Sequence, residues 1–307
     1  MEDLCMYMGR QQQNVLTAER YITAELKRNS VPYITSKFIA ETPLCTASLS
    51  VDSKSIECKG TSFVGGKIDS KSVVLSSTIP SRFNLENSNI NFNPYSDAVS
   101  CVNFYFAPAI AISRRDVAKV LLGNKISGSV VVKRLRTPVS HILVGNVKNP
   151  ENIVFAHYDS ILTGALDNAS GVAVSLFLVI QQRELLENTL FVFDPCEELS
   201  FDKPTYWGYG FRVFEKKFPK LMTGAKKIIP IDCVGNGPVT IDVNPSVLYL
   251  AFPIKNFEAL KNKMITLYSS LSGLMRVYHS SLDKPSTIKE KYLREAAIKL
   301  TSLLKNV

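Results

Sequence analysis

Short apolar runs in the second half of the chain are followed by side chains that can bind a metal ion. These side chains are His157, Asp167, Glu198, Asp232 and His279. Most of them come soon after a run of four apolar residues that is typical of a β-strand, such as 153–156 or 228–231. In an open α/β sheet the carboxyl ends of the strands share one edge, where ligands bind. The sequence therefore predicts that residues far apart along the chain converge in one crevice.

Length and composition exclude several classes of protein. A chain of 307 residues can bury a large core, as one large domain or as two unequal ones. No stretch reaches the ~18 consecutive apolar residues of a membrane span. The N-terminus begins acidic and lacks a basic-then-apolar signal sequence, so a cytoplasmic protein that binds no membrane is expected. The net charge of +9 comes from scattered basic residues, which does not indicate a nucleic-acid partner.

Three segments differ in their pattern. Residues 1–38 contain an amphipathic helix, expected at 15–28, and form an N-terminal part of the main domain. Residues 39–136 alternate short β-rich runs with polar turns, apart from one helix at 114–122 that Ser113 is expected to cap. Residues 137–307 alternate strands with helices. The expected fold class is α/β: a mixed, mostly parallel sheet with helices on both faces, plus a smaller β-rich inserted domain.

The elements expected from periodicity and turn signals follow this division. The strands are expected at 48–51, 72–75, 99–106, 130–132, 142–147, 153–156, 190–193, 228–231 and 274–277. The helices after residue 137 are expected at 170–186, 211–218, 257–271 and 287–304.

The candidate residues suit zinc chemistry. Zinc binds imidazole nitrogen and carboxylate oxygen at ~2.0–2.2 Å, and a catalytic zinc keeps one position open. Two ions ~3.5–4 Å apart need a carboxylate between them. Glu197, beside Glu198, can serve as a base that does not bind the metal. Asp159, two residues after His157, can accept the second imidazole N–H and fix the tautomer.

Five sequence blocks resemble the signatures of the co-catalytic di-zinc aminopeptidases, metallopeptidase family 28. The blocks are FAHYDS at 155–160, GALDNASGVA at 164–173, CEE at 196–198, IDCVG at 231–235, and Tyr278-His279 with Asp283 downstream. The resemblance covers residues 137–307 and the N-terminal helix, and it implies a zinc-peptidase-like fold. Residues 108–116 and 121–123 are similar to the protease-associated domain that several members insert.

The resemblance implies a metal-ligand set for two Zn²⁺ ions per chain. Asp167 would bridge the two ions. His157 and Asp232 would hold one ion, and Glu198 and His279 would hold the other.

It also implies catalytic roles. Glu197 would be the general base, Asp159 would orient His157, and Tyr278 would hydrogen-bond the tetrahedral intermediate. The peptide bond between Asp167 and Asn168 would be cis.

The implied activity is that of an exopeptidase that removes N-terminal residues. Its partner would be a peptide with a free N-terminus, hydrolysed by a water between the zinc ions with Glu197 as base, and a homo-oligomer is possible. Two alternatives stay open: a non-catalytic binding protein of the same fold, and an aminoacyl-cyclising transferase of the glutaminyl-cyclase kind, which typically uses one zinc. The complete ligand set and the retained base argue against both. The family's Ser-Asp-His-x-x-Phe block is missing between Asp232 and His279, so the preferred side chain is not predicted.

Other candidate residues have simpler interpretations. His141 is expected to be structural. The six cysteines show no CxxC spacing and are expected to be free thiols. Cys196 and Cys233 flank ligand positions, but small buried thiols are the favoured interpretation.

Overall fold

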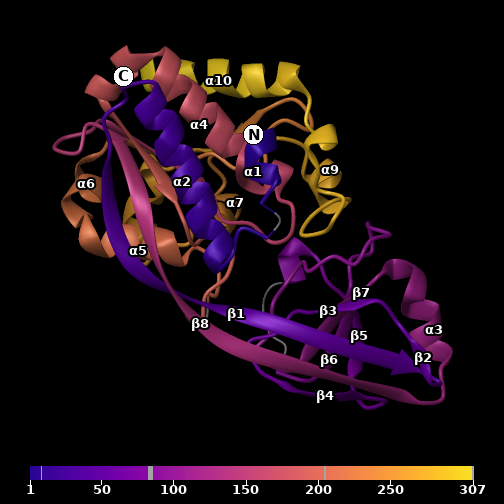
Figure 1. The fold of residues 1–307 in the computed structure, drawn as a ribbon. Helices are drawn as coiled ribbons and strands as arrows, with labels where there is room; N and C mark the ends of the chain where they lie inside the picture. The colour runs from indigo at the N-terminus through magenta and orange to yellow at the C-terminus, as the bar shows by residue number, and fades with distance from the viewer. Residues whose placement is uncertain (8, 82–85, 204, 306–307) are drawn as a thin grey trace. The chain divides into compact units, whose positions relative to one another are not determined.

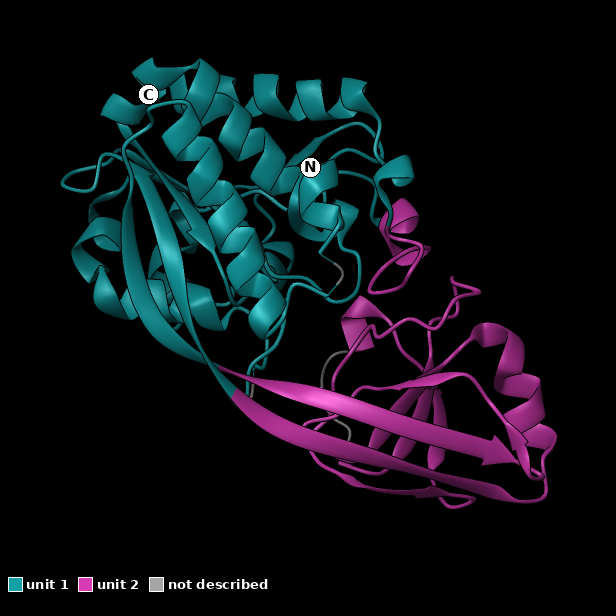
Figure 2. Cartoon of the chain, viewed as in Figure 1, with its two compact units in different colours: residues 1–40, 136–271, 284–307 teal, residues 41–135, 272–283 magenta. Residues whose placement is uncertain are grey.

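The chain forms two compact units, each with its own hydrophobic core. The computed structural model describes residues 1–7, 9–81, 86–203 and 205–305. Unit 1 contains residues 1–40, 136–271 and 284–307, and unit 2 contains residues 41–135 and 272–283 (Figure 2). The chain passes from unit 1 to unit 2 within β1 (Ile34–Val51) and returns within β8 (Ile126–Gly145).

The sheet of unit 1 is mixed. Its central strands are β9 (Asn152–His157), β10 (Thr189–Asp194) and β11 (Lys227–Pro230). The order is β11-β9-β10-β8-β1, in which β9 pairs in parallel with both β10 and β11. Strand β10 pairs antiparallel with β8. The predicted α/β fold with a mixed sheet is therefore confirmed.

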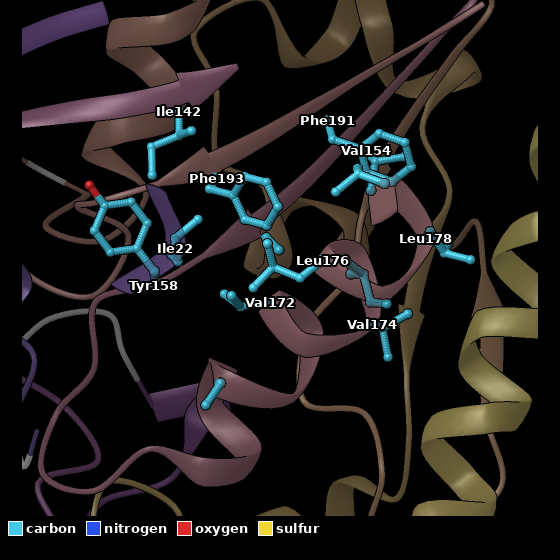
Figure 3. Close-up of a cluster of buried hydrophobic side chains, with 14 of the residues drawn as sticks. Ile22, Ile142, Val154, Tyr158, Val172, Val174, Leu176, Leu178, Phe191 and Phe193 are labelled. Atoms are coloured by element: carbon cyan, nitrogen blue, oxygen red, sulfur yellow. The ribbon is translucent and has the colours of Figure 1, made fainter. Parts of the chain in front are cut away.

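Successive side chains of the central strands point to opposite faces of the sheet, and both faces are covered. Val154 and Ala156 of β9 belong to one buried cluster, and Ile153 and Phe155 belong to another. The first cluster lies under helices α2 (Gln13–Arg28), α4 (Ser170–Gln181) and α10 (Glu290–Lys305), which Figure 1 shows on one side of unit 1. Figure 3 shows its side chains converging between the strands and α4. The strands are apolar on both faces because both faces are buried.

The helix α2 shows how sequence pattern becomes packing. Its buried residues Val15, Ala18, Ile22 and Leu26 recur every three or four positions, so they lie on one stripe. The helix ends at Asn29, whose side-chain amide donates to the carbonyl of Glu25 at 2.9 Å. The predicted helix at 15–28 is therefore confirmed.

The remaining helices and strands of unit 1 surround this sheet. They are α1 (Glu2–Cys5), α5 (Tyr209–Lys217), α6 (Pro219–Gly224), β12 (Thr240–Asp242), α7 (Pro245–Ala251), α8 (Phe257–Leu260) and β13 (Thr266–Tyr268). The second buried cluster receives side chains from α5, α6, α7 and α8 on the other face of the sheet. Among the described residues, no helix is long and apolar enough to cross a membrane.

Unit 2 is mainly β-structure. It contains β2 (Lys54–Ser55), β3 (Cys58–Gly60), β4 (Gly66–Asp69), β5 (Val73–Ser76), β6 (Asn89–Phe92), β7 (Ala109–Ile112) and α3 (Val117–Leu122), while α9 (Leu271–Met275) leads into its second segment. The order β3-β7-β6-β5 forms one sheet. Ser113 caps the turn before α3, as predicted, because its hydroxyl accepts a hydrogen bond from the amide of Arg115 at 3.1 Å.

Several expected elements differ from the structure. Residues 130–132 and 142–147 were expected as two strands, but β8 is one continuous strand, because the largely exposed, basic stretch 133–136 continues the strand between the two apolar runs. Residues 274–277 do not form a strand; α9 covers 271–275, since a short apolar run does not distinguish helix from strand. The expected helix at 257–271 is wrong beyond Leu260, because β13 pairs with β12 there. Residues 99–106 contain isolated bridges only.

A buried position of the sheet and an exposed position of α4 predict different costs for the same substitution. Phe191 on β10 is fully buried, whereas Phe177 on α4 is 49% exposed. Phe191→Ala should lower the free energy of unfolding by ~3–5 kcal/mol because it leaves a cavity. Phe177→Ala should change it by less than ~0.5 kcal/mol. Urea unfolding of both variants checks this, and equal midpoints would contradict the described core.

Candidate metal centre

The four candidate metal ligands of unit 1 lie close together. Three of them lie at or shortly after the ends of sheet strands, and the fourth lies directly before helix α4. His157 is the last residue of β9. Glu198 comes four residues after the end of β10, and Asp232 comes two residues after the end of β11. Asp167 lies in the irregular turn Ala165–Ala169, directly before α4. The convergence expected from the sequence is therefore present for these four side chains.

His157 points its Nε2 atom into a group of carboxylates. Nε2 lies 3.2 Å from Oδ1 of Asp167 and 3.4 Å from Oδ1 of Asp232. The side chain is 2% exposed, and Nε2 has no hydrogen-bond partner among the described residues. Ligand atoms ~2.0–2.1 Å from a zinc ion at tetrahedral angles lie ~3.3 Å from one another. The spacing around Nε2 is therefore close to that between ligands of one metal ion.

Two groups of possible ligand atoms share Asp167. One group is His157, Asp167 and Glu198, and the other is Asp167, Asp232 and Cys233; within each group the ligand atoms lie within 4.8 Å of one another. A carboxylate common to two groups can bridge two ions. Asp167 is the one residue that belongs to both of these groups.

The carboxylate of Asp159 contacts both the imidazole of His157 and the backbone of the glutamate pair Glu197 and Glu198. Its Oδ1 lies 3.3 Å from Nδ1 of His157 and accepts a hydrogen bond from the amide of Glu197 at 3.0 Å. Its Oδ2 accepts from the amide of Glu198 at 3.0 Å and from the side-chain amide of Gln11 at 3.1 Å. Nδ1 also lies 3.3 Å from the main-chain carbonyl oxygen of Asp159. These two acceptors favour the tautomer in which Nε2 carries the lone pair, the form that binds a metal. Asp159 thus orients His157 and fixes the backbone of both glutamates.

Glu197 is buried beside these groups. Its burial raises the pKa of the carboxyl well above its usual range, an effect that the positive charge of His157 opposes and that the charges of Glu198 and Asp232 increase. A raised pKa strengthens the carboxylate as a base, since it then holds a proton more readily. Glu198, in contrast, accepts a hydrogen bond from the amide of Ile161 through Oε1 at 3.3 Å.

The acidic surroundings also act on His157. Burial by itself lowers the pKa of the imidazole, but the charge of Asp232 and the side chains of Asp159 and Asp167 outweigh burial and raise the pKa well above its usual range. The same carboxylates that favour an imidazolium favour any cation at this place. A divalent ion in contact with His157 would take over that role and would require the neutral imidazole.

The turn that carries Asp167 is locked to the neighbouring strand by the next residue. The peptide bond between Asp167 and Asn168 is cis, as the family resemblance implied. The side-chain Nδ2 of Asn168 donates to the carbonyl of Ile231 at 2.8 Å, and its Oδ1 accepts from the backbone amide of Gly171 at 2.9 Å. These bonds connect the turn before α4 to the residue that precedes Asp232.

The sequence interpretation missed a support that comes from the N-terminal segment. Arg10 is fully buried, and its guanidinium donates to the carbonyls of Tyr158, Thr163 and Gly164 at 2.8, 2.8 and 2.9 Å. These carbonyls belong to the loop between His157 and Asp167. No motif surrounds Arg10 or Gln11 in the sequence, so only the three-dimensional contact shows their role.

Tyr278 and His279 belong to unit 2. Their rings stack with centroids 3.7 Å apart, and both side chains are buried. Nδ1 of His279 lies 2.9 Å from the carbonyl oxygen of Cys101 and must donate to it, so the ligand atom that His279 can offer is Nε2. The groups of possible ligand atoms found among the described residues of unit 1 do not include His279, so its participation is a proposal that rests on the sequence block.

The simpler interpretations are tested as well. His141 is fully buried, with Nε2 3.1 Å from Oδ2 of Asp194 and its ring stacked on Phe38, which fits the structural role expected. All six cysteines are free thiols, as expected. Cys196 donates to the carbonyl of Leu199 at 3.4 Å, and burial raises the pKa of its thiol well above its usual range.

Comparisons with known proteins also find similarity to metallopeptidases. Residues 139–244 match the model of Peptidase family M28. The zinc aminopeptidase BSAP of Bacillus subtilis is 13% identical over 95% of this chain and 88% of that chain, with a TM-score of 0.65. A peptidase M28 precursor from Shewanella amazonensis is 14% identical over 99% and 90% of the two chains, also with a TM-score of 0.65. A glutaminyl cyclase from Fimbriiglobus ruber is 10% identical over 97% and 90%, with a TM-score of 0.53.

No curated protein matches the sequence. The solved structures show the fold. The family model covers the segment that contains all four candidate ligands of unit 1, namely His157, Asp167, Glu198 and Asp232. The chain is similar to the M28 zinc aminopeptidases in this segment and in its fold.

The contact between Asn168 and Gly171 predicts the effect of one added methyl group. A Cβ on Gly171 would lie 2.4 Å from Oδ1 of Asn168 and 2.8 Å from the carbonyl oxygen of Ile231. Gly171→Ala should lower the free energy of unfolding by ~1–3 kcal/mol, since overpacking displaces neighbours. Gly224→Ala is the matched control, because nothing lies within 4 Å of a Cβ there. Urea unfolding measures both variants; a Gly171→Ala protein as stable as the control would refute the described packing.

Proposed function

We propose that the protein is a zinc-dependent aminopeptidase. The observation that carries this proposal is the buried Nε2 of His157, which makes no hydrogen bond and faces Asp167 and Asp232 at the spacing of metal ligands. The M28 segment and the fold shared with zinc aminopeptidases support the same assignment.

The residues present fit zinc ions. One imidazole and three carboxylates from unit 1 surround the centre, and nitrogen with oxygen ligands suits zinc. In the proposal, Asp167 bridges two ions, His157 and Asp232 hold one of them, and Glu198 and His279 hold the other. Bound zinc supplies Lewis acidity that polarises a carbonyl and lowers the pKa of water.

The chain's own residues would move the proton. Glu197 stands next to a ligand without being part of either ligand group, so its carboxylate remains available as a base. It would accept a proton from the attacking water and deliver it to the leaving amine, which its raised pKa permits. The carboxylates of the centre would also attract the α-ammonium group of a peptide, which favours a substrate with a free N-terminus. Tyr278 is the proposed donor to the oxyanion.

The retained base separates this proposal from its alternatives. A glutaminyl cyclase shares the fold at a TM-score of 0.53, so the fold does not distinguish hydrolysis from cyclisation. Aminoacyl anilides test the first reaction, and peptides with an N-terminal glutamine test the second. Cyclisation without anilide hydrolysis would exclude the aminopeptidase. A protein that binds zinc but converts neither substrate would be a binding protein.

The neighbours Glu197 and Glu198 should respond differently to the same substitution. Glu197→Gln keeps the shape and removes the basic site, so it should reduce kcat by ~10²–10⁴ while zinc content stays near that of the unchanged protein. Glu198→Gln removes a ligand oxygen charge and should weaken zinc binding by ~10–100-fold or more. Anilide hydrolysis and elemental analysis measure the two effects. Full turnover of Glu197→Gln, or loss of its zinc, would show that the roles are wrongly assigned.

The number of zinc ions bound per chain tests whether His279 is a metal ligand. Titration of the metal-free protein with zinc should saturate at two ions per chain. His279→Ala should saturate at one, because it removes a ligand of the ion that Glu198 also holds, while circular dichroism shows that the fold is kept. Two tightly bound ions in His279→Ala would remove His279 from the centre. One ion in the unchanged protein would exclude the bridged arrangement.

A further inference from the structure

We propose that the thiol of Cys233 is a ligand of the metal ion that His157, Asp167 and Asp232 surround. The inference rests on the metal centre proposed above and adds a sulfur atom to it. The sequence alone favoured a small buried thiol at this position.

The thiol lies inside the second group of ligand atoms. Its Sγ is within 4.8 Å of carboxylate oxygens of both Asp167 and Asp232. The thiol donates a hydrogen bond to Oδ1 of Asp232 at 3.2 Å, and the residue is 7% exposed. Sulfur bound to zinc lies ~2.3 Å from it, so ligand sulfur and oxygen atoms are ~3.6 Å apart at the tetrahedral angle. A movement of a few tenths of an ångström converts the hydrogen-bonded geometry into that of two ligands.

An independent observation indicates an ion at the same point. Oδ1 of Asp232, which accepts from the thiol, is also the atom that lies 3.4 Å from Nε2 of His157. That nitrogen is buried and makes no hydrogen bond. Nitrogen and sulfur therefore approach one carboxylate oxygen from two different strand ends, with Asp167 adjacent to both. Cys233 shares one group of possible ligand atoms with Asp167 and Asp232, His157 belongs to the other group, and Asp167 is common to both.

The backbone holds Cys233 in an unusual conformation. Its φ angle is 52°, in the left-handed region that residues other than glycine seldom adopt. The carbonyl of Cys233 accepts a hydrogen bond from the amide of Ser269 at 3.1 Å, and the hydroxyl of Ser269 accepts from the amide of Gly235 at 3.0 Å. These bonds fix the turn that follows Asp232. They therefore also fix the position of the Cys233 backbone that carries the thiol.

Coordination by Cys233 changes what the centre can do. On binding a metal ion, the thiol of Cys233 would release its proton to the buffer, and a lone pair of its sulfur would be the ligand. A thiolate favours zinc, cobalt or cadmium over magnesium, calcium or manganese.

Cobalt(II) substitution tests the inference through absorption rather than activity. Cobalt bound to the metal-free protein should give visible ligand-field bands together with a near-ultraviolet sulfur-to-cobalt charge-transfer band. Cys233→Ser should keep the visible bands and lose the charge-transfer band. Cys196→Ser is the matched control, since Cys196 is a buried thiol next to Glu197 that lies in neither ligand group, and it should keep both features.

A second measurement does not depend on a variant. Zinc should protect Cys233 from alkylation, as mapped by mass spectrometry of the protein with and without zinc, while labelling of the partly exposed Cys58 should not change. Visible cobalt bands without charge transfer in the unchanged protein would overturn the thiolate ligand and leave the proposed aminopeptidase intact. A charge-transfer band that persists in Cys233→Ser would overturn it as well. Failure to bind cobalt or zinc at all would overturn both proposals.

Discussion

The carboxylate of Asp159 is the interaction on which the arrangement of the centre depends. Its two oxygens lie against His157 on one side and accept the amides of Glu197 and Glu198 on the other. One buried side chain thus sets the imidazole tautomer and the path of the chain after β10. Hydrogen bonds to a charged acceptor are stronger than those between neutral groups, and burial increases their strength further. Gln11 completes the shell of Asp159 from a segment with no recognisable motif.

The buried carboxylates of the centre are costly without a cation. Asp167 and Glu198 are 4% and 3% exposed, and Glu197 is 8% exposed. Like charges in a medium of low dielectric constant repel one another, which is why the pKa of Glu197 is raised once burial has acted. A divalent ion reverses the sign of this interaction. Metal binding should therefore stabilise the fold as well as create the reactive site, and the two effects are linked.

The sequence predicted the centre better than it predicted the surrounding elements. Strand ends and short polar motifs are local, so the grouping of His157, Asp167 and Asp232 followed from the parallel sheet and from family-like blocks. The long strand β8 did not, because the exposed, basic stretch 133–136 interrupts its apolar pattern without ending the strand. The supporting contact of Arg10 joins residues about 150 positions apart, for which one sequence contains no signal. Cys233 was undervalued because its distance to Asp167 is a property of the folded turn.

The most direct test of the central claim is anomalous diffraction at the zinc absorption edge from crystals grown with zinc. The account predicts an anomalous peak ~2.0–2.2 Å from Nε2 of His157 and from carboxylate oxygens of Asp167 and Asp232. A second peak on the other side of Asp167, next to Glu198, would complete the bridged pair. Crystals in which the side chains keep the described positions but no peak lies within bonding distance of His157 would contradict the account.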